Sequence, residues 1–293
     1  MEKSEIAKYV KAGEIAKDCQ GISRKKLGPG TNLYEFAEEI EAAIIKKGGA
    51  PAFPINLSRN NEAAHYTPGF ESKDTAGEED VIKVDIGVHV DGFIADSAFT
   101  IDFSGKHSAM VKASEDALEK AVEAAKEGTA LGEIGKRIES AIKSMGFRPI
   151  ENLSGHGVSE YDAHTFPTIP NIANNDPNLL GDGMAVAIEP FATDGEGAIH
   201  EGSQTEIFQL KEKKAVRSNE ARQILKLAEE KYPKLPFAER WVQRELEMSE
   251  FKRKIGLREL MQKGCLMAYP ILKEQEGKTV TQAETTLLIT KGK

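Results

Sequence analysis

Apolar residues recur along this chain with a helical period in four stretches, residues 4–20, 31–48, 107–127 and 131–145. In the second stretch the residues that share one helix face are Leu33, Phe36, Ile40, Ala43 and Ile44. Asn32 and Glu35 have the spacing of a helix-capping pair, and Gly48-Gly49 ends the run. We therefore expect two helix pairs, one before and one after a central stretch of strands.

The clearest strand pattern is VIKVDIGVHVDGFIADS, residues 81–97, where two alternating apolar runs flank Asp91-Gly92. This dipeptide is typical of a tight β-hairpin turn. With a two-residue loop, the register places Asp96 opposite Gly87, and Asp85 falls on the same face as a diagonal neighbour, roughly 7–8 Å from Asp96 at the backbone. We expect Gly87 to leave open space beside the Asp96 carboxylate.

The paired aspartates have two interpretations. A strand face that is simply solvated would explain one aspartate, although Asp is a poor strand former. Two carboxylates on one face repel each other unless water or a cation screens them, and paired carboxylates suit a divalent metal ion. If a metal binds there, further ligands must come from elsewhere in the chain.

An internal repeat indicates where those ligands lie. GTNLYEFAEEIEAAIIKKG, residues 30–48, and GTALGEIGKRIESAIKSMG, residues 128–146, agree at 9 of 19 positions. A proline follows each segment, at Pro51 and Pro149, and an Asn-Leu-Ser then begins at residues 56 and 152. These repeated flanks predict two related α/β halves around a pseudo-two-fold axis. A site on that axis would draw ligands from both halves.

The second half contains three candidates. His156 lies between two glycines, which alone is a weak signal, and Glu189 ends the apolar segment GMAVAIEP. Glu284 lies in the last apolar strand, QAETTLLIT. A carboxylate in a buried strand is unfavourable unless it is paired or bound to metal. A metal and a salt bridge are the two alternatives for Glu189.

Charged amphipathic helices fill residues 215–265, and two strands follow, joined at Glu276-Gly277. This order resembles a winged-helix module, but without a basic face we expect a wall or lid beside the site. The predicted organisation is one α/β catalytic domain, residues 1–204 and 266–293, with a helical insertion at residues 205–265 completed by the strands of residues 266–290.

Composition limits the function classes. The chain has 293 residues and a net charge of −8, and no basic cluster indicates a specific nucleic-acid partner. No apolar signal segment or run of about 18 apolar residues is present, so we expect a soluble cytoplasmic protein with no membrane partner. Cys19 and Cys265 form no CxxC motif and are expected to be inert thiols.

Several segments together resemble the methionine aminopeptidases of the second type, the archaeal and eukaryotic-cytosolic form. They are AFPINLSRNNEAAHYTP (52–68), VIKVDIGVHVDGFIADSA (81–98), SGHGVSEYDAH (154–164), PTIPN (167–171), AIEPFAT (187–193) and the terminal QAETTLLI. The resemblance implies a pita-bread fold whose helical insertion precedes the last ligand. It implies five metal ligands, Asp85, Asp96, His156, Glu189 and Glu284. Ala283 and Thr285 depart from the family pattern, which commonly has an aromatic residue and a histidine there.

The activity implied by the resemblance is removal of the N-terminal methionine from nascent chains with a small second residue. The implied cofactor is two divalent ions (Co, Mn, Fe or Zn) with a bridging hydroxide as nucleophile. The implied roles are a proton shuttle at Glu189, substrate contacts at His65 and His164, and an apolar pocket wall at Phe53. We further expect a monomer and leave contact with the ribosome open. The alternatives are an Xaa-Pro peptidase of the same fold and a non-catalytic binding relative.

Overall fold

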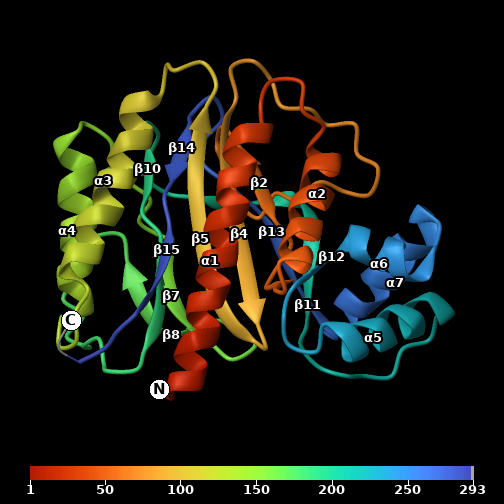
Figure 1. Cartoon of the computed structure of the whole chain (residues 1–293). Helices are drawn as coiled ribbons and strands as arrows, with labels where there is room; N and C mark the ends of the chain where they lie inside the picture. Colours follow the sequence, from red (N-terminus) through yellow and green to blue (C-terminus); the bar gives the residue numbers. More distant parts are fainter. Residues whose placement is uncertain (292–293) are drawn as a thin grey trace.

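The computed structural model describes residues 1–291 and combines helices with four small sheets (Figure 1). The helices are α1 Lys3–Lys26, α2 Leu33–Lys46, α3 Ser108–Ala124, α4 Leu131–Ser144, α5 Asn219–Lys231, α6 Glu239–Leu246 and α7 Glu250–Gln262. The strands of the first half are β1 Ala50–Pro51, β2 Asn56–Arg59, β3 Glu62–Ala64, β4 Val81–Val90 and β5 Phe93–Asp102. The later strands are β6 Arg148–Pro149, β7 Ser154–Ser159, β8 Asp162–Pro170, β9 Ala185–Ile188, β10 Phe191–Thr193, β11 His200–Leu210, β12 Phe237–Ala238, β13 Leu266–Lys273, β14 Val280–Gln282 and β15 Thr285–Leu288.

The central hairpin, β4 and β5, has the register that the sequence predicts. Asp96 pairs with Gly87 and Asp85 pairs with Ala98, so both carboxylates lie on one face. The opposite face carries buried apolar residues that pack with α1 and α2. In Figure 1, α1 crosses β4 and β5 on this apolar side. The helix layer therefore covers one face of the hairpin, and the two aspartates face away from it.

The first helix is longer than its apolar pattern predicts, because tertiary contacts extend it from residue 20 to Lys26. Ser23 is buried, and the guanidinium of Arg24 lies 3.9 Å from the centroid of the Phe99 ring. These contacts with the core stabilise the last turn although the hydrophobic period has faded. Pro29 then prevents further helix.

The predicted repeat is confirmed element by element. Adding 98 to the bounds of α2, Leu33–Lys46, gives the bounds of α4, Leu131–Ser144. The same offset relates β1 to β6, and the start of β2 to the start of β7. Even the turns match, because Gly30 and Gly128 have φ of 83° and 84°. The two halves therefore share one local structure, as the sequence indicated.

The helices α5, α6 and α7 lie together at one side of the molecule (Figure 1) and enclose their own apolar cluster around Trp241. The strands expected to complete a winged-helix module do not pair with each other. Instead β13 pairs with β11 and β3, while β14 pairs with β10 and β15 with β9. That expectation is wrong because the last strands complete the sheets of the two halves.

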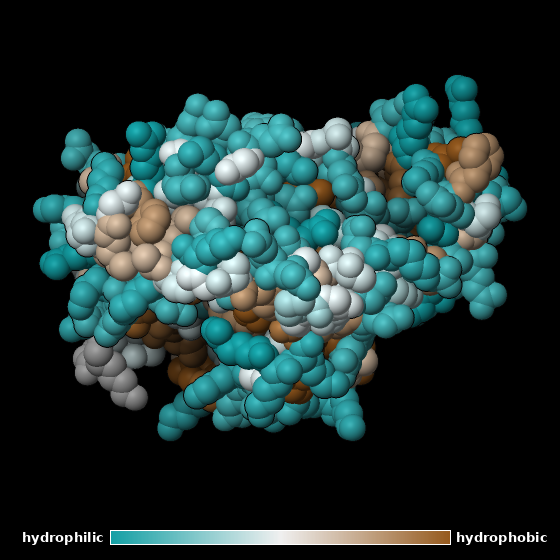
Figure 2. Space-filling view, turned by 90° about the horizontal axis from the view of Figure 1, so that it is seen from above, coloured by the Kyte–Doolittle hydropathy of each residue, from teal (hydrophilic) through white to brown (hydrophobic). Residues whose placement is uncertain are grey.

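The face seen in Figure 2 is covered mainly by hydrophilic side chains, with apolar side chains in small patches between them. Within residues 1–291 no helix has the length and apolarity needed to cross a membrane.

Candidate metal centre and active site

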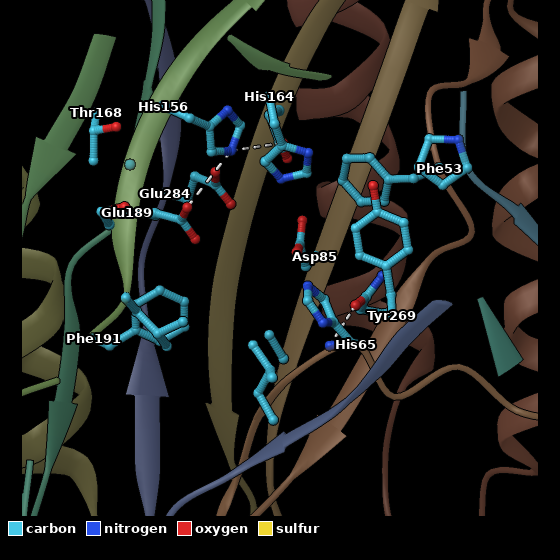
Figure 3. A pocket seen from close by; sticks show the side chains of 18 of the residues that line it. Phe53, His65, Asp85, His156, His164, Thr168, Glu189, Phe191, Tyr269 and Glu284 are labelled. Carbon is cyan, nitrogen blue, oxygen red and sulfur yellow. Dashed lines mark hydrogen bonds and ion pairs between the residues drawn. The ribbon is translucent and has the colours of Figure 1, made fainter. Parts of the chain in front are cut away.

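A cavity of about 510 Å³ opens on the face of the hairpin that carries the aspartates. All eight residues singled out in the sequence line it, namely Phe53, His65, Asp85, Asp96, His156, His164, Glu189 and Glu284. They come from both halves of the chain. In Figure 3, His156, Glu189 and Glu284 lie at one side of this cavity, while Phe53, His65 and Tyr269 lie at the other. The fold therefore brings together residues that are up to 231 positions apart in sequence, from Phe53 to Glu284.

The carboxylates are fixed by strand pairing. Asp85 and Asp96 project from β4 and β5, and Glu189 directly follows β9. Glu284 lies between β14 and β15, where its backbone N–H donates to the carbonyl of Ala98 at 2.9 Å. This bond places Glu284 beside the hairpin. Gln282 donates hydrogen bonds of 3.3 Å to both Glu189 and Glu284.

Burial dominates the electrostatics of this carboxylate group. Burial raises the pKa of Asp96 to about 7, and it raises the pKa values of Asp85, Glu189 and Glu284 well above their ordinary range. One oxygen each of Asp85 and Asp96 is buried without a hydrogen-bond partner among the described residues. A buried oxygen without a partner is unfavourable. A divalent cation would satisfy both oxygens.

His156 supplies the nitrogen donor that such a cation needs. Its Nε2 lies 3.8 Å from Asp96 Oδ2 and 3.6 Å from Glu189 Oε1. Its Nδ1 lies 3.2 Å from the carbonyl oxygen of Gly157, which can only accept, so Nδ1 carries the proton and Nε2 presents its lone pair. Burial lowers the pKa of His156 to about 3, so the ring is neutral. Ligand atoms of Asp96, His156 and Glu284 all lie within 4.8 Å of one another, a spacing that fits a metal ion.

The two other histidines line the cavity beside this group. His65 has a left-handed backbone, with φ of 68°, and its N–H donates to Asn56 Oδ1 at 2.7 Å. Its Nδ1 lies 3.1 Å from the carbonyl oxygen of Pro270, and burial lowers its pKa to about 4. The His164 ring centroid lies 4.3 Å from that of His156, and burial also lowers the pKa of His164.

Among the lining residues that the sequence analysis did not single out, two contact the histidines of the site. Asn56 lines the cavity and holds the backbone of His65. Its signal was present, since it begins the repeated Asn-Leu-Ser. Tyr269 packs against both His65 and His164, with ring centroids 5.4 and 6.3 Å away. It lies on β13, which the sequence assigned to the wing, so no sequence signal placed it here.

Residues 7–219 match Metallopeptidase family M24. The chain belongs to metallopeptidase family M24. A methionine aminopeptidase of Methanocaldococcus jannaschii is 42% identical over 290 residues, which is 99% of this chain and 97% of the relative. One of Archaeoglobus fulgidus is 44% identical over 285 residues, 97% of this chain and 95% of the relative.

Solved structures agree with the predicted fold. The structure of a thermophilic Arx1 covers 99% of this chain and 89% of its own, with a TM-score of 0.86 at 17% identity. A methionine aminopeptidase of Thermotoga maritima covers 99% and 94%, with a TM-score of 0.69 at 22% identity. At these identities the likeness shows the fold alone. The pita-bread fold expected from the sequence is confirmed, and membership of family M24 implies use of a divalent metal.

The structure corrects one expectation about this site and places the two departures from the family pattern. Gly87 does not leave open space beside Asp96, because the Phe53 ring packs on it and a Cβ at residue 87 would overlap that ring. Glycine is required there so that Phe53 can line the cavity. Ala283 and Thr285 line a separate groove of about 490 Å³ between α1 and α3. The departures from the family pattern therefore flank Glu284 and line a groove separate from the cavity.

Proposed function

We propose that this M24 metallopeptidase removes the N-terminal methionine from polypeptide chains, as a methionine aminopeptidase of the second type. The archaeal relatives at 42–44% identity are named methionine aminopeptidases and are matched over nearly their whole length. The observation that carries the proposal is the group of four buried carboxylates and one neutral imidazole in a cavity that Phe53 also lines. The helices α5 to α7, which lie between Glu189 and Glu284, support the second type.

The residues that would hold metal in this proposal are Asp85, Asp96, His156, Glu189 and Glu284. Four carboxylates supply about four negative charges, which balance two divalent ions. When bound, such ions supply Lewis acidity that activates water and polarises the scissile carbonyl. Oxygen-rich sites with one imidazole accept Mn, Fe, Co or Zn, so the bound metal must be identified by metal analysis of the purified protein.

Proton transfer is assigned to Glu189. As a carboxylate of the group that would hold metal, Glu189 could accept the proton of the activated water and later release it to the leaving amine. His164 is assigned a hydrogen bond to the oxygen of the scissile carbonyl as negative charge develops there. His65 would orient the substrate from the opposite wall, and Phe53 would contact the methionine side chain.

Substrate range and organisation follow as further parts of the proposal. A preference for a small second residue, such as Gly, Ala, Ser, Thr or Val, is taken from the family resemblance. Residues 205–265 would form an insertion beside a catalytic domain built from residues 1–204 and 266–293. A monomeric state and nascent-chain substrates remain predictions, and contact with the ribosome stays open.

A peptide assay tests this function. Met-Gly-Met should release free methionine, a chelator should stop the release, and added Mn or Co should restore it. Peptides with proline in second place and other N-terminal residues test the Xaa-Pro alternative. Faster cleavage of those peptides, or methionine release that survives complete removal of metal, would overturn the proposal.

A further inference from the structure

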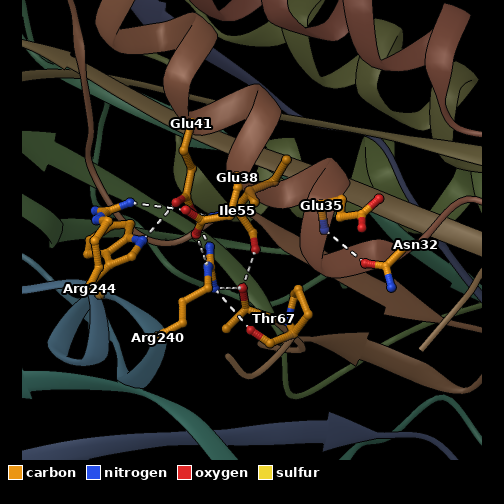
Figure 4. A network of polar contacts seen from close by, with 10 residues as sticks. Asn32, Glu35, Glu38, Glu41, Ile55, Thr67, Arg240 and Arg244 are labelled. Atoms are coloured by element: carbon orange, nitrogen blue, oxygen red, sulfur yellow. Dashed lines mark hydrogen bonds and ion pairs between the residues drawn. The ribbon is translucent and has the colours of Figure 1, made fainter. Parts of the chain in front are cut away.

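A buried polar network joins the helical segment to the wall of the cavity (Figure 4). Arg240 of α6 is almost completely buried, and so are its partners Glu41 of α2 and Thr67. Arg240 donates to Glu41 through Nη2, to Thr67 Oγ1 at 2.6 Å through Nη1, and to Glu38 Oε1 at 3.1 Å through Nε. Trp241 Nε1 donates to the second Glu41 oxygen at 2.7 Å.

Both branches of the network end on the backbone of one residue, Ile55. Glu41 Oε1 accepts from the N–H of Ile55 at 3.2 Å, and Thr67 Oγ1 donates to the carbonyl of Ile55 at 2.7 Å. Arg240 thus reaches the backbone N–H and the backbone carbonyl of Ile55, which belong to two successive peptide units, through one intermediate on each side. Ile55 is itself buried, so its backbone depends on these partners.

The next residue, Asn56, links this fixed point to the cavity. Asn56 Oδ1 accepts from the N–H of His65 at 2.7 Å, while its Nδ2 donates to the carbonyl of Pro54 at 2.7 Å. His65 needs such support because its left-handed backbone is uncommon for a residue with a side chain. A buried ion pair gives little net stability, since both charges lose their hydration. Arg240 and Glu41 therefore contribute mainly by fixing the geometry of the backbone at Ile55.

We propose that Arg240, Glu41 and Thr67 are positioning residues that hold the His65 ring in the cavity through Ile55 and Asn56. This inference rests on the proposed function, in which His65 contacts substrate. It gives α6 a part in catalysis although none of its side chains lines the cavity.

Thr67→Val tests the proposal, because it removes the hydroxyl and keeps the side-chain shape. In the metal-loaded enzyme we expect kcat/KM on Met-Gly-Met to fall roughly three- to tenfold, as for one lost buried hydrogen bond. Thr67→Ser keeps the hydroxyl and should restore most of the rate. Thr193→Val is the matched control, because the buried Thr193 hydroxyl also donates to a backbone carbonyl, that of Thr279 at 2.8 Å, and should leave the rate unchanged.

A double-mutant cycle separates positioning from general destabilisation. If Thr67 acts through His65, then Thr67→Val in a His65→Ala background should change kcat/KM by less than about twofold. A threefold or larger loss in that background would overturn the proposal. Should Thr67→Val fail to fold, Glu41→Gln replaces it in the same cycle.

The imidazole resonances of the zinc-loaded protein give a readout that needs no activity. His65 is identified among the six histidines by its loss in His65→Ala. We expect Thr67→Val to shift or broaden the His65 signals and Thr193→Val to leave them in place; unchanged signals in Thr67→Val would overturn the proposal. If His65→Ala keeps full activity, the catalytic role proposed for His65 fails, and the spectra still decide whether Thr67 positions the ring.

Discussion

In the metal-free protein, the stability that Asp96 contributes should fall as pH rises. Asp96 is buried, with a pKa of about 7 against an ordinary 3.8. A folded-state pKa above the unfolded value means that the folded state holds a proton more tightly. The corresponding stability is fully present below about pH 3.8 and is lost as pH rises through 7.

The size of the effect follows from the two pKa values. The difference of roughly three pH units corresponds to about 4 kcal/mol of unfolding free energy, lost mainly between pH 4 and 7. The buried histidines act in the opposite direction. The pKa of His65 is lowered to about 4 and that of His156 to about 3, so their contributions are lost as pH falls below 6.5. A single stability curve would mix both effects.

Comparison with Asp96→Asn separates them, because the variant keeps both histidines. Urea unfolding of the chelated proteins from pH 4 to 7.5 should show wild type losing up to about 4 kcal/mol relative to the variant. Adding metal should reverse the trend, since ligation requires ionised carboxylates and its stabilisation grows with pH. Parallel curves for the chelated wild type and Asp96→Asn would refute the assignment of a raised pKa to this residue.

Three further predictions address the site. His156→Ala should make activity depend steeply on added metal, whereas His164→Ala should keep its metal content and lose roughly 10²- to 10³-fold in kcat; equal metal loss in both variants, measured by metal titration, would contradict the assignment. Met-Gly peptides should be cleaved much faster than Met-Lys peptides in steady-state assays, and comparable rates would rule out selection by a small second residue. Gly87→Ala should lower the unfolding free energy by roughly 1–3 kcal/mol through overlap with Phe53, with partial rescue by Phe53→Leu; urea unfolding that finds no loss would place the ring elsewhere.

The sequence predicted the parts of the fold that depend on local pattern. The Asp91-Gly92 turn sets the hairpin register, which in turn places Asp85 and Asp96 on one face, and the repeat is detectable because its helix and its flanking motifs recur in the same order. Gly87 shows that a local pattern does not predict contacts with residues distant in the chain. Its small size was interpreted as open space, but a ring 34 positions earlier in the chain, that of Phe53, occupies it.

The prediction for the strands at the end of the chain was wrong for a related reason. The order of three helices and two strands predicted a local hairpin, but β13, β14 and β15 pair with three different sheets. Strand pairing over long sequence separations leaves no periodic signal in the strand itself. The sequence pattern therefore could not predict that Tyr269 lies at the site, or that the carbonyl of Pro270 is the partner of His65 there.

The two ends of the cavity differ in how the duplicated halves build them. The carboxylate end uses the duplication directly, because the hairpin of one half meets strands of the other. The histidine end breaks the symmetry. His65 and His164 occupy nearly equivalent places, since adding 98 to 65 gives the neighbour of His164. The strand β13, which follows the helical segment, then places the Pro270 carbonyl against His65 and the Tyr269 ring between both histidines. The segment that is not duplicated thus gives two related imidazoles different surroundings, which the distinct roles proposed for them would require.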